Sequence, residues 1–153
     1  MSDETRTLWQ NVQLWLPLVS GLLVQAVKFL GNWVRHRRPD FRVLIQAGGM
    51  PSSHAAVVCS LATAVALQYS LGSTLFAIAV VLAVIVMYDA AGVRRAASRQ
   101  AYVLNQIIDE LFQGHPISEV RLRELIGHTP FEVIVGAVIG VAFTWLFITW
   151  GGL

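Results

Sequence analysis

Charged residues are scarce in this sequence of 153 residues, and their scarcity argues against an ordinary soluble domain. Asp, Glu, Lys and Arg together make up 13% of the chain, whereas a typical soluble domain carries about 25%. Hydrophobic residues make up 56%, an imbalance that water alone cannot solvate in a globule of this size. We therefore expect lipid to be part of the solvent around this chain.

Cysteine and excess charge are also nearly absent. The single Cys59 lies in an apolar run and has no second cysteine with which to form an internal disulfide. The net charge is only +2, so a nucleic-acid partner is not indicated. Residues 1–10 lack the pattern of a cleavable signal peptide, and we expect the first apolar run to remain as an anchor.

Four long apolar stretches are present, and each is a candidate transmembrane helix. They cover residues 12–34, 53–69, 73–91 and 131–150. The second stretch is short, and a re-entrant segment is the alternative for it. The sequence predicts an all-α fold: one membrane domain over residues 1–153, built as a bundle of four transmembrane helices.

The arginines predict how this bundle is oriented. Two loops, 35–50 and 93–130, hold nine arginines, while only Arg6 lies on the other side of the predicted bundle. Basic loops face the cytoplasm, so we expect both loops there, in a bacterial cytoplasmic membrane. The longer loop also repeats apolar residues at helical spacing, which predicts an amphipathic helix at the membrane interface, and a second short helix is predicted over residues 119–126.

The polar residues of the apolar stretches gather at one predicted depth, on the arginine-rich side. Two helix N-termini lie there, and helix N-termini attract anions. Cations and two histidines at the same depth can bind a phosphate and supply a nucleophile and a general acid. The residues concerned are Lys28, Arg35, Ser52, Ser53, His54, Asp89, Arg94, Arg95, His128 and Glu132.

Each of these residues also has a purely structural interpretation. Ser52 or Ser53 could be an N-cap, and Thr129 with Glu132 fits a capping box. Lys28 could extend to the headgroups or pair with Asp89. The same polar cluster could also serve a small anion or lipid transporter, or a lipid-binding protein, without hydrolysis.

Several motifs, in this order, resemble the divergent phosphatidic acid phosphatase type 2 family. The resemblance covers residues 22–145 approximately and rests on four segments. These are Gly48–His54, Tyr88–Arg95, Gln100–Ala101 with Leu104–Asn105, and Gly127–Pro130 with Glu132–Val133.

The resemblance implies catalytic roles for three residues. It makes His128 the nucleophile, Glu132 its orienting partner, and His54 the acid that protonates the leaving alkoxide. Glu132 stands where the wider superfamily has Asp, and Ser53 stands where it has Gly. The implied activity is metal-independent hydrolysis of a lipid phosphate monoester or diphosphate through a phosphohistidine, without a cofactor.

The implied phosphate ligands depart further from the superfamily pattern. Lys28 and Arg35 have the expected spacing, but His36 follows where proline is usual. No arginine stands at the expected spacing before His128, so Arg94 or Arg95 is expected to supply that charge. The remaining implied phosphate ligands are Ser52 and Ser53, with Asp89 and Asn105 as further polar residues of the site.

The expected partners are the lipid phosphate substrate, the membrane and a second copy of the chain. Four spans make a thin bundle, which favours a homodimer. Gly136 and Gly140 form a small-residue pair at the spacing that lets two membrane helices approach closely. This pair is the candidate dimer contact.

Overall fold

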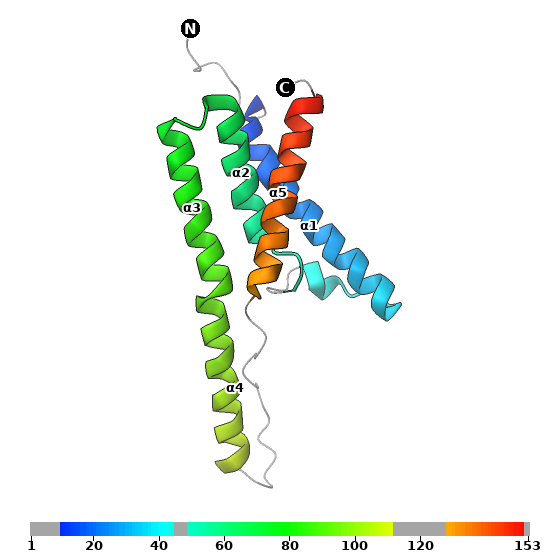
Figure 1. The fold of residues 1–153 in the computed structure, drawn as a ribbon. Coiled ribbons are helices and arrows are strands. Elements are labelled where there is room, and N and C mark those ends of the chain that lie inside the picture. The colour runs from blue at the N-terminus through cyan, green and yellow to red at the C-terminus, as the bar shows by residue number, and fades with distance from the viewer. Residues whose placement is uncertain (1–9, 45–48, 112–127, 152–153) are drawn as a thin grey trace.

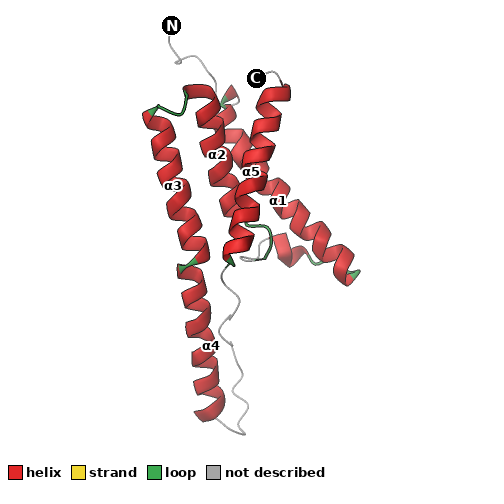
Figure 2. Cartoon of the chain, in the orientation of Figure 1, coloured by secondary structure: helices red, strands yellow, loops and turns green. Residues whose placement is uncertain are grey.

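The computed structural model describes residues 10–44, 49–111 and 128–151, without the side chains of residues 93–99 and 110. Within these ranges the regular secondary structure is entirely helical, as predicted, with no strand. Helices lie at all four predicted apolar stretches (Figures 1 and 2). The elements are α1 (Val12–His36), η3 (Phe41–Leu44), α2 (Ser53–Tyr69), α3 (Thr74–Ala91), α4 (Val93–Leu111) and α5 (Pro130–Gly151).

Side-chain oxygens cap the first turn of α1, α2 and α3, as Thr129 does for α5. Asn11 Oδ1 accepts from the backbone N–H of Leu14 at 3.2 Å, and Ser73 Oγ accepts from that of Phe76 at 3.2 Å. Ser52 does the same for α2. These caps satisfy N–H groups that have no partner within the helix, which defines where each apolar helix starts.

Three helices, α1, α3 and α5, are long and apolar enough to cross a membrane. The 17-residue α2 is apolar but shorter, so a fourth span stays a prediction. α2 nevertheless lies at the centre of the bundle, in contact with α1, α3 and α5 (Figure 1). Three of its small residues, Ala55, Ala56 and Ser60, are fully buried. A central helix is screened from lipid by its neighbours, so a short one is tolerated there.

The closest helix pair is α2 with α5, because two glycines of α5 face the backbone of α2. A Cβ atom added at Gly136 would collide with the carbonyl oxygen of Ser52, and one at Gly140 with that of Ala56. One further turn along, Ser60 Oγ and Thr144 Oγ1 form a buried hydrogen bond of 2.6 Å. The glycine pair is thus occupied within one chain, and the predicted homodimer has no support from it.

α4 continues the direction of α3 and extends beyond the bundle (Figure 1). The two helices meet at Gly92, whose N–H donates to the carbonyl of Tyr88 at 2.8 Å. A helix is therefore present where an amphipathic one was predicted, but it is not laid across the end of the bundle. The short helix predicted over 119–126 lies outside the described residues.

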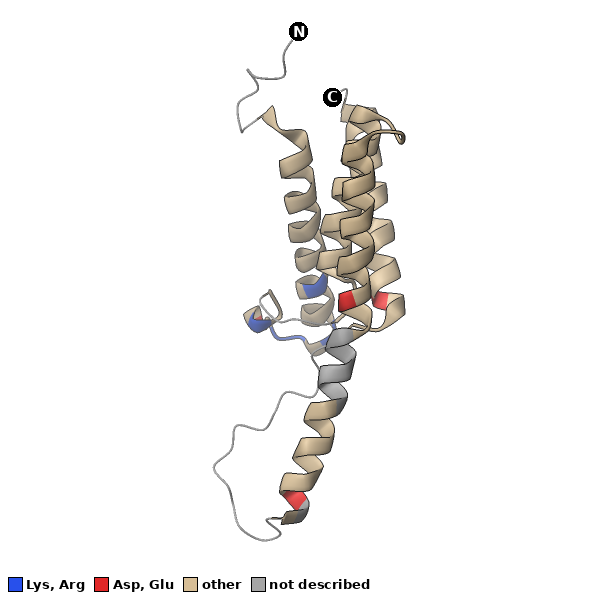
Figure 3. Cartoon of the chain, turned by 90° about the vertical axis from the view of Figure 1, so that its left-hand side faces the viewer, with Lys and Arg blue, Asp and Glu red and all other residues tan. Residues whose placement is uncertain are grey.

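Charged residues of the described helices and turns are absent from one half of the bundle and gather towards the other end (Figure 3). α1 begins and α5 ends at the end without charges, which also holds the turn between α2 and α3 (Figure 1). The starts of α2 and α5 and the end of α3 lie at the charged end. This arrangement brings Ser52, Asp89 and His128, which lie at these three helix ends, to one level of the molecule.

Candidate active site

The start of α5 is built as a reciprocal capping box. The backbone N–H of Thr129 donates to Glu132 Oε2 at 2.9 Å, and the N–H of Glu132 donates to Thr129 Oγ1 at 3.3 Å. Pro130 occupies the first helical position, where its missing N–H costs nothing. The predicted capping role of Thr129 and Glu132 is thus confirmed, and it fixes the position of the Glu132 carboxylate.

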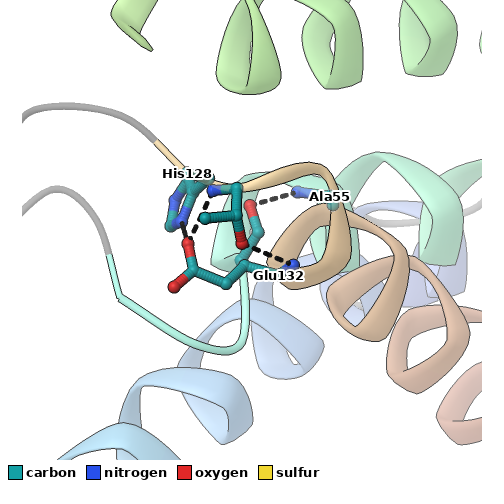
Figure 4. Close-up of polar contacts among 5 residues, drawn as sticks. Ala55, His128 and Glu132 are labelled. Carbon is teal, nitrogen blue, oxygen red and sulfur yellow. Dashed lines mark hydrogen bonds and ion pairs between the residues drawn. The ribbon is translucent and has the colours of Figure 1, made fainter. Parts of the chain in front are cut away.

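His128 packs directly against this capping box. Its side chain is 2% exposed, and its backbone N–H donates to the carbonyl of Ala90 at the end of α3, at 3.2 Å. Its Nδ1 lies 3.3 Å from Glu132 Oε2 (Figure 4). A carboxylate can only accept, so this contact favours the proton on Nδ1 and leaves the lone pair of Nε2 for reaction. A buried imidazole held in this tautomer can act as a nucleophile.

The start of α2 is joined to the same structure. The backbone N–H of Ser52 donates to the carbonyl of Glu132 at 3.0 Å, and Ser52 Oγ accepts from the N–H of Ala55 at 3.4 Å (Figure 4). Ser52 is 0% exposed, so its hydroxyl serves first as the N-cap of α2. The hydroxyl oxygen of Ser53, the next residue, is buried without a hydrogen-bond partner among the described residues.

The charges around His128 come from three helices. Burial lowers the pKa of His128 below 6.5, while its hydrogen bond to Glu132 opposes this effect. The positive charges of Lys28 and, more weakly, of His54 lower the pKa of His128 further. Lys28 reaches the site from α1 with only 8% of its surface exposed, whereas His54 is exposed in the first turn of α2. The net effect is a neutral imidazole at neutral pH.

The other predicted site residues lie at different distances from this cluster. Asp89, which is partly exposed, adjoins Ala90 at the end of α3. Arg35 is exposed on α1, two turns or about 10 Å beyond Lys28. Asn105 is buried on α4, about 24 Å from Asp89 along the axis of the successive helices α3 and α4. Arg94 and Arg95 begin α4, and their side chains lie outside the described part of the structure.

Two structural contributors were not predicted from the sequence. The carbonyl of Ala90 holds the backbone of His128, and Gly136 allows Ser52 to approach α5. A backbone carbonyl leaves no pattern in the sequence, so Ala90 had no detectable signal. Among the described residues no three His, Cys, Asp or Glu side chains gather into a possible metal site.

These features define a class: a helical membrane protein with a buried histidine–carboxylate pair between two helix N-termini. The model of the divergent PAP2 family matches residues 9–143, so the chain belongs to that family. The chain is also 36% identical over 145 residues to the uncharacterized membrane protein YuiD of Bacillus subtilis (strain 168). That match covers 88% of this chain and 92% of the relative. No solved structure shows a significant match.

Proposed function

We propose that this protein is an integral membrane phosphatase that hydrolyses a lipid phosphate monoester or diphosphate. The observation that carries the proposal is His128, which is buried beside Lys28 with its Nδ1 against the Glu132 carboxylate. A structural histidine would not need a cation and a helix N-terminus at the same place. Membership of a family named after phosphatidic acid phosphatase supports the same activity.

The first step of the proposed reaction forms a phosphohistidine. The lone pair of His128 Nε2 attacks phosphorus while the bond from phosphorus to the leaving oxygen breaks. His54 donates a proton to that oxygen, which leaves as an alcohol from a monoester or as a phosphate from a diphosphate. The Glu132 carboxylate holds the Nδ1 proton and stabilises the positive charge that develops on the imidazole.

The second step releases inorganic phosphate. His54 is neutral after the first step, because it has given up its proton. It now takes a proton from a water molecule, whose oxygen attacks phosphorus. The bond from phosphorus to His128 Nε2 breaks as the new bond forms. Both histidines return to their starting forms, so the cycle consumes one water molecule. The reaction needs only positioning and electrostatic stabilisation of the transferred group, which protein side chains can supply.

The phosphate oxygens are proposed to lie between Lys28 and the first turn of α2. Lys28 provides a positive charge, Ser53 provides a buried hydroxyl without a partner among the described residues, and the helix provides N–H groups. Arg35, Arg94 and Arg95 are proposed as further ligands. Ser52 is proposed to donate its O–H while it caps α2. By the positive-inside rule the site faces the cytoplasm.

Release of inorganic phosphate by the purified protein tests this function. The wild type, with EDTA present, is supplied with a panel of lipid phosphate monoesters and diphosphates. We expect His128→Ala to reduce release to background and His54→Ala to reduce it by about a hundredfold to ten-thousandfold. His36→Ala is the matched control, because His36 is exposed and contacts Asn32 of its own helix at 3.1 Å.

Two results would contradict the proposal. One is no phosphate release by the wild type across the whole panel. The other is equal release by the wild type, His54→Ala and His128→Ala. Movement of an anion or lipid across liposome membranes without hydrolysis would instead support a transporter.

A further inference from the structure

Beyond the candidate active site, the chain leaving α1 forms a basic turn, residues 35–44. The helix ends where Arg37 adopts a left-handed conformation, with φ of 53°. Asp40 Oδ1 then accepts from the backbone N–H of Arg42 at 3.0 Å and starts η3. The ring of Phe41 stacks on Phe29 of α1, with centroids 5.3 Å apart, and holds η3 against the helix.

Positive charge dominates this turn. Its four arginines against one aspartate give a net charge of 4 − 1 = +3, with histidine neutral. All four arginine side chains are exposed, and no carboxylate among the described residues forms an ion pair with them. The charge of the basic turn is therefore available to an external anion. The arginines are Arg35, Arg37, Arg38 and Arg42.

Large apolar side chains are exposed beside the same arginines. Trp33 and Val34 occupy the last turns of α1, and Phe41 and Leu44 lie in η3. The basic turn lies at the charged end of the bundle (Figure 3). Aromatic and basic residues together at a helix end are typical of the boundary between hydrocarbon and headgroups.

We propose that Arg37, Arg38 and Arg42 of the basic turn form a docking surface for anionic phospholipid headgroups, next to the candidate active site to which Arg35 is assigned. Guanidinium groups donate two parallel hydrogen bonds to phosphate oxygens, and several basic residues together attract an anionic leaflet. An acidic peptide would meet the same charge, but it would leave Phe41 and Val34 in water. Acyl chains cover these side chains while the headgroup meets the arginines.

Lipid binding at the basic turn needs no catalysis, so it is tested without turnover. The full-length protein in neutral detergent micelles is titrated with phosphatidylglycerol or phosphatidylcholine, and its thermal midpoint is followed. A ligand that binds only the folded protein raises the midpoint. The variant R37Q/R38Q/R42Q removes three charges and keeps Arg35, a proposed phosphate ligand. The variant R37K/R38K/R42K is the matched control that keeps the charge.

We expect phosphatidylglycerol to raise the midpoint of the wild type and the Lys variant more than phosphatidylcholine does. The Gln variant should lose this preference, because each arginine near a membrane surface contributes about fivefold to affinity. His128→Ala should keep the preference, which separates this inference from the proposed phosphatase activity.

Two results would overturn the inference. The first is an equal response of the wild type to both lipids. The second is a phosphatidylglycerol preference that survives in the Gln variant. If that surviving preference is lost in Lys28→Met, the headgroup is assigned to the active site instead.

Discussion

Lys28 and Glu132 act on His128 in opposite directions. The charge of Lys28 lowers the pKa of His128, and Glu132 raises it through a hydrogen bond and its negative charge. In the proposed reaction the neutral imidazole is the nucleophile, so activity should fall as the pH drops through this pKa. We expect the acid limb of kcat/KM to have a midpoint below 6.5 in the wild type.

Substitution at these two positions should move that limb in opposite directions. Lys28→Met removes a cation, so the midpoint should rise towards that of free histidine. Glu132→Gln removes the interaction that favours the imidazolium, so the midpoint should fall. Both variants should also lose activity, and the shift is read from the shape of the pH profile. Equal midpoints in all three proteins would contradict the electrostatic assignment.

The free energy of unfolding should also fall as the pH drops through the pKa of His128, as the proposed activity does. Its pKa is depressed in the folded state, so the unfolded chain binds more protons just below pH 6.5. Stability should therefore be lost as the pH falls through that range. His128→Gln should weaken this dependence, which thermal midpoints measured from pH 5 to 8 would show.

For individual residues, the sequence predicted contacts between neighbouring side chains but not contacts made by the backbone. The family resemblance made Glu132 the partner of His128, and in the structure the two side chains are in contact. The burial of Ser52 could not be predicted, because it depends on Glu132 and Gly136 of another helix. No local pattern encodes a contact across 80 residues.

The close packing of α2 on α5 gives a prediction about the stability of the bundle. Gly136→Ala adds a methyl group against the carbonyl of Ser52, which is backbone and cannot rotate away. We expect a loss of about 1–3 kcal/mol from overpacking, measured as a lower thermal midpoint. Gly31→Ala is the matched control, since an added Cβ there meets nothing within 4 Å. That change should be neutral or stabilising, because alanine favours a helix.

The hydrogen bond between Ser60 and Thr144 is a second link between the same helices. Both side chains are fully buried, and each hydroxyl satisfies the other at 2.6 Å. A double-mutant cycle with Ser60→Ala and Thr144→Val should give a coupling energy of about 0.6 kcal/mol. Strictly additive losses of stability would show that the two residues do not interact.

Helix positions were predictable, whereas the faces by which they pack were not. Apolar runs together with signals for helix ends located α1, α2, α3 and α5 within two residues of the bounds observed. α3 and α5 are apolar on all sides, so periodicity carries no information about their buried face. The small-residue pair of α5 indicated a close contact but not its partner.

Sidedness is a property of the whole molecule, and two positions test it. Arg42 lies in η3 at the charged end, and Ser73 lies in the turn between α2 and α3 at the other end (Figure 1). Single cysteines at these positions, in a Cys59→Ala background, should react with an impermeant thiol reagent from opposite sides of the membrane. Labelling of both from the same side would contradict a spanning α2.

The clustering of charge predicted which ends of the helices meet. Arginine-rich loops on one side required the starts of α2 and α5 and the end of α3 to share a level, as Figure 1 shows. The central place of α2 and the direction of α4 could not be predicted. Both depend on packing between helices that lie far apart in the sequence.

A single oxygen atom has two partners in this molecule. Glu132 Oε2 accepts from the N–H of Thr129, which begins α5, and contacts the imidazole of His128. Random mutation at this position would therefore reduce protein yield and turnover together, and a library screened only for expression would still be enriched in glutamate. In Glu132→Asp the side chain is one methylene shorter, so its carboxylate should reach either the N–H of Thr129 or the imidazole of His128, but not both. If the proposed phosphatase activity is under selection, changes in its rate would have to come from residues other than Glu132.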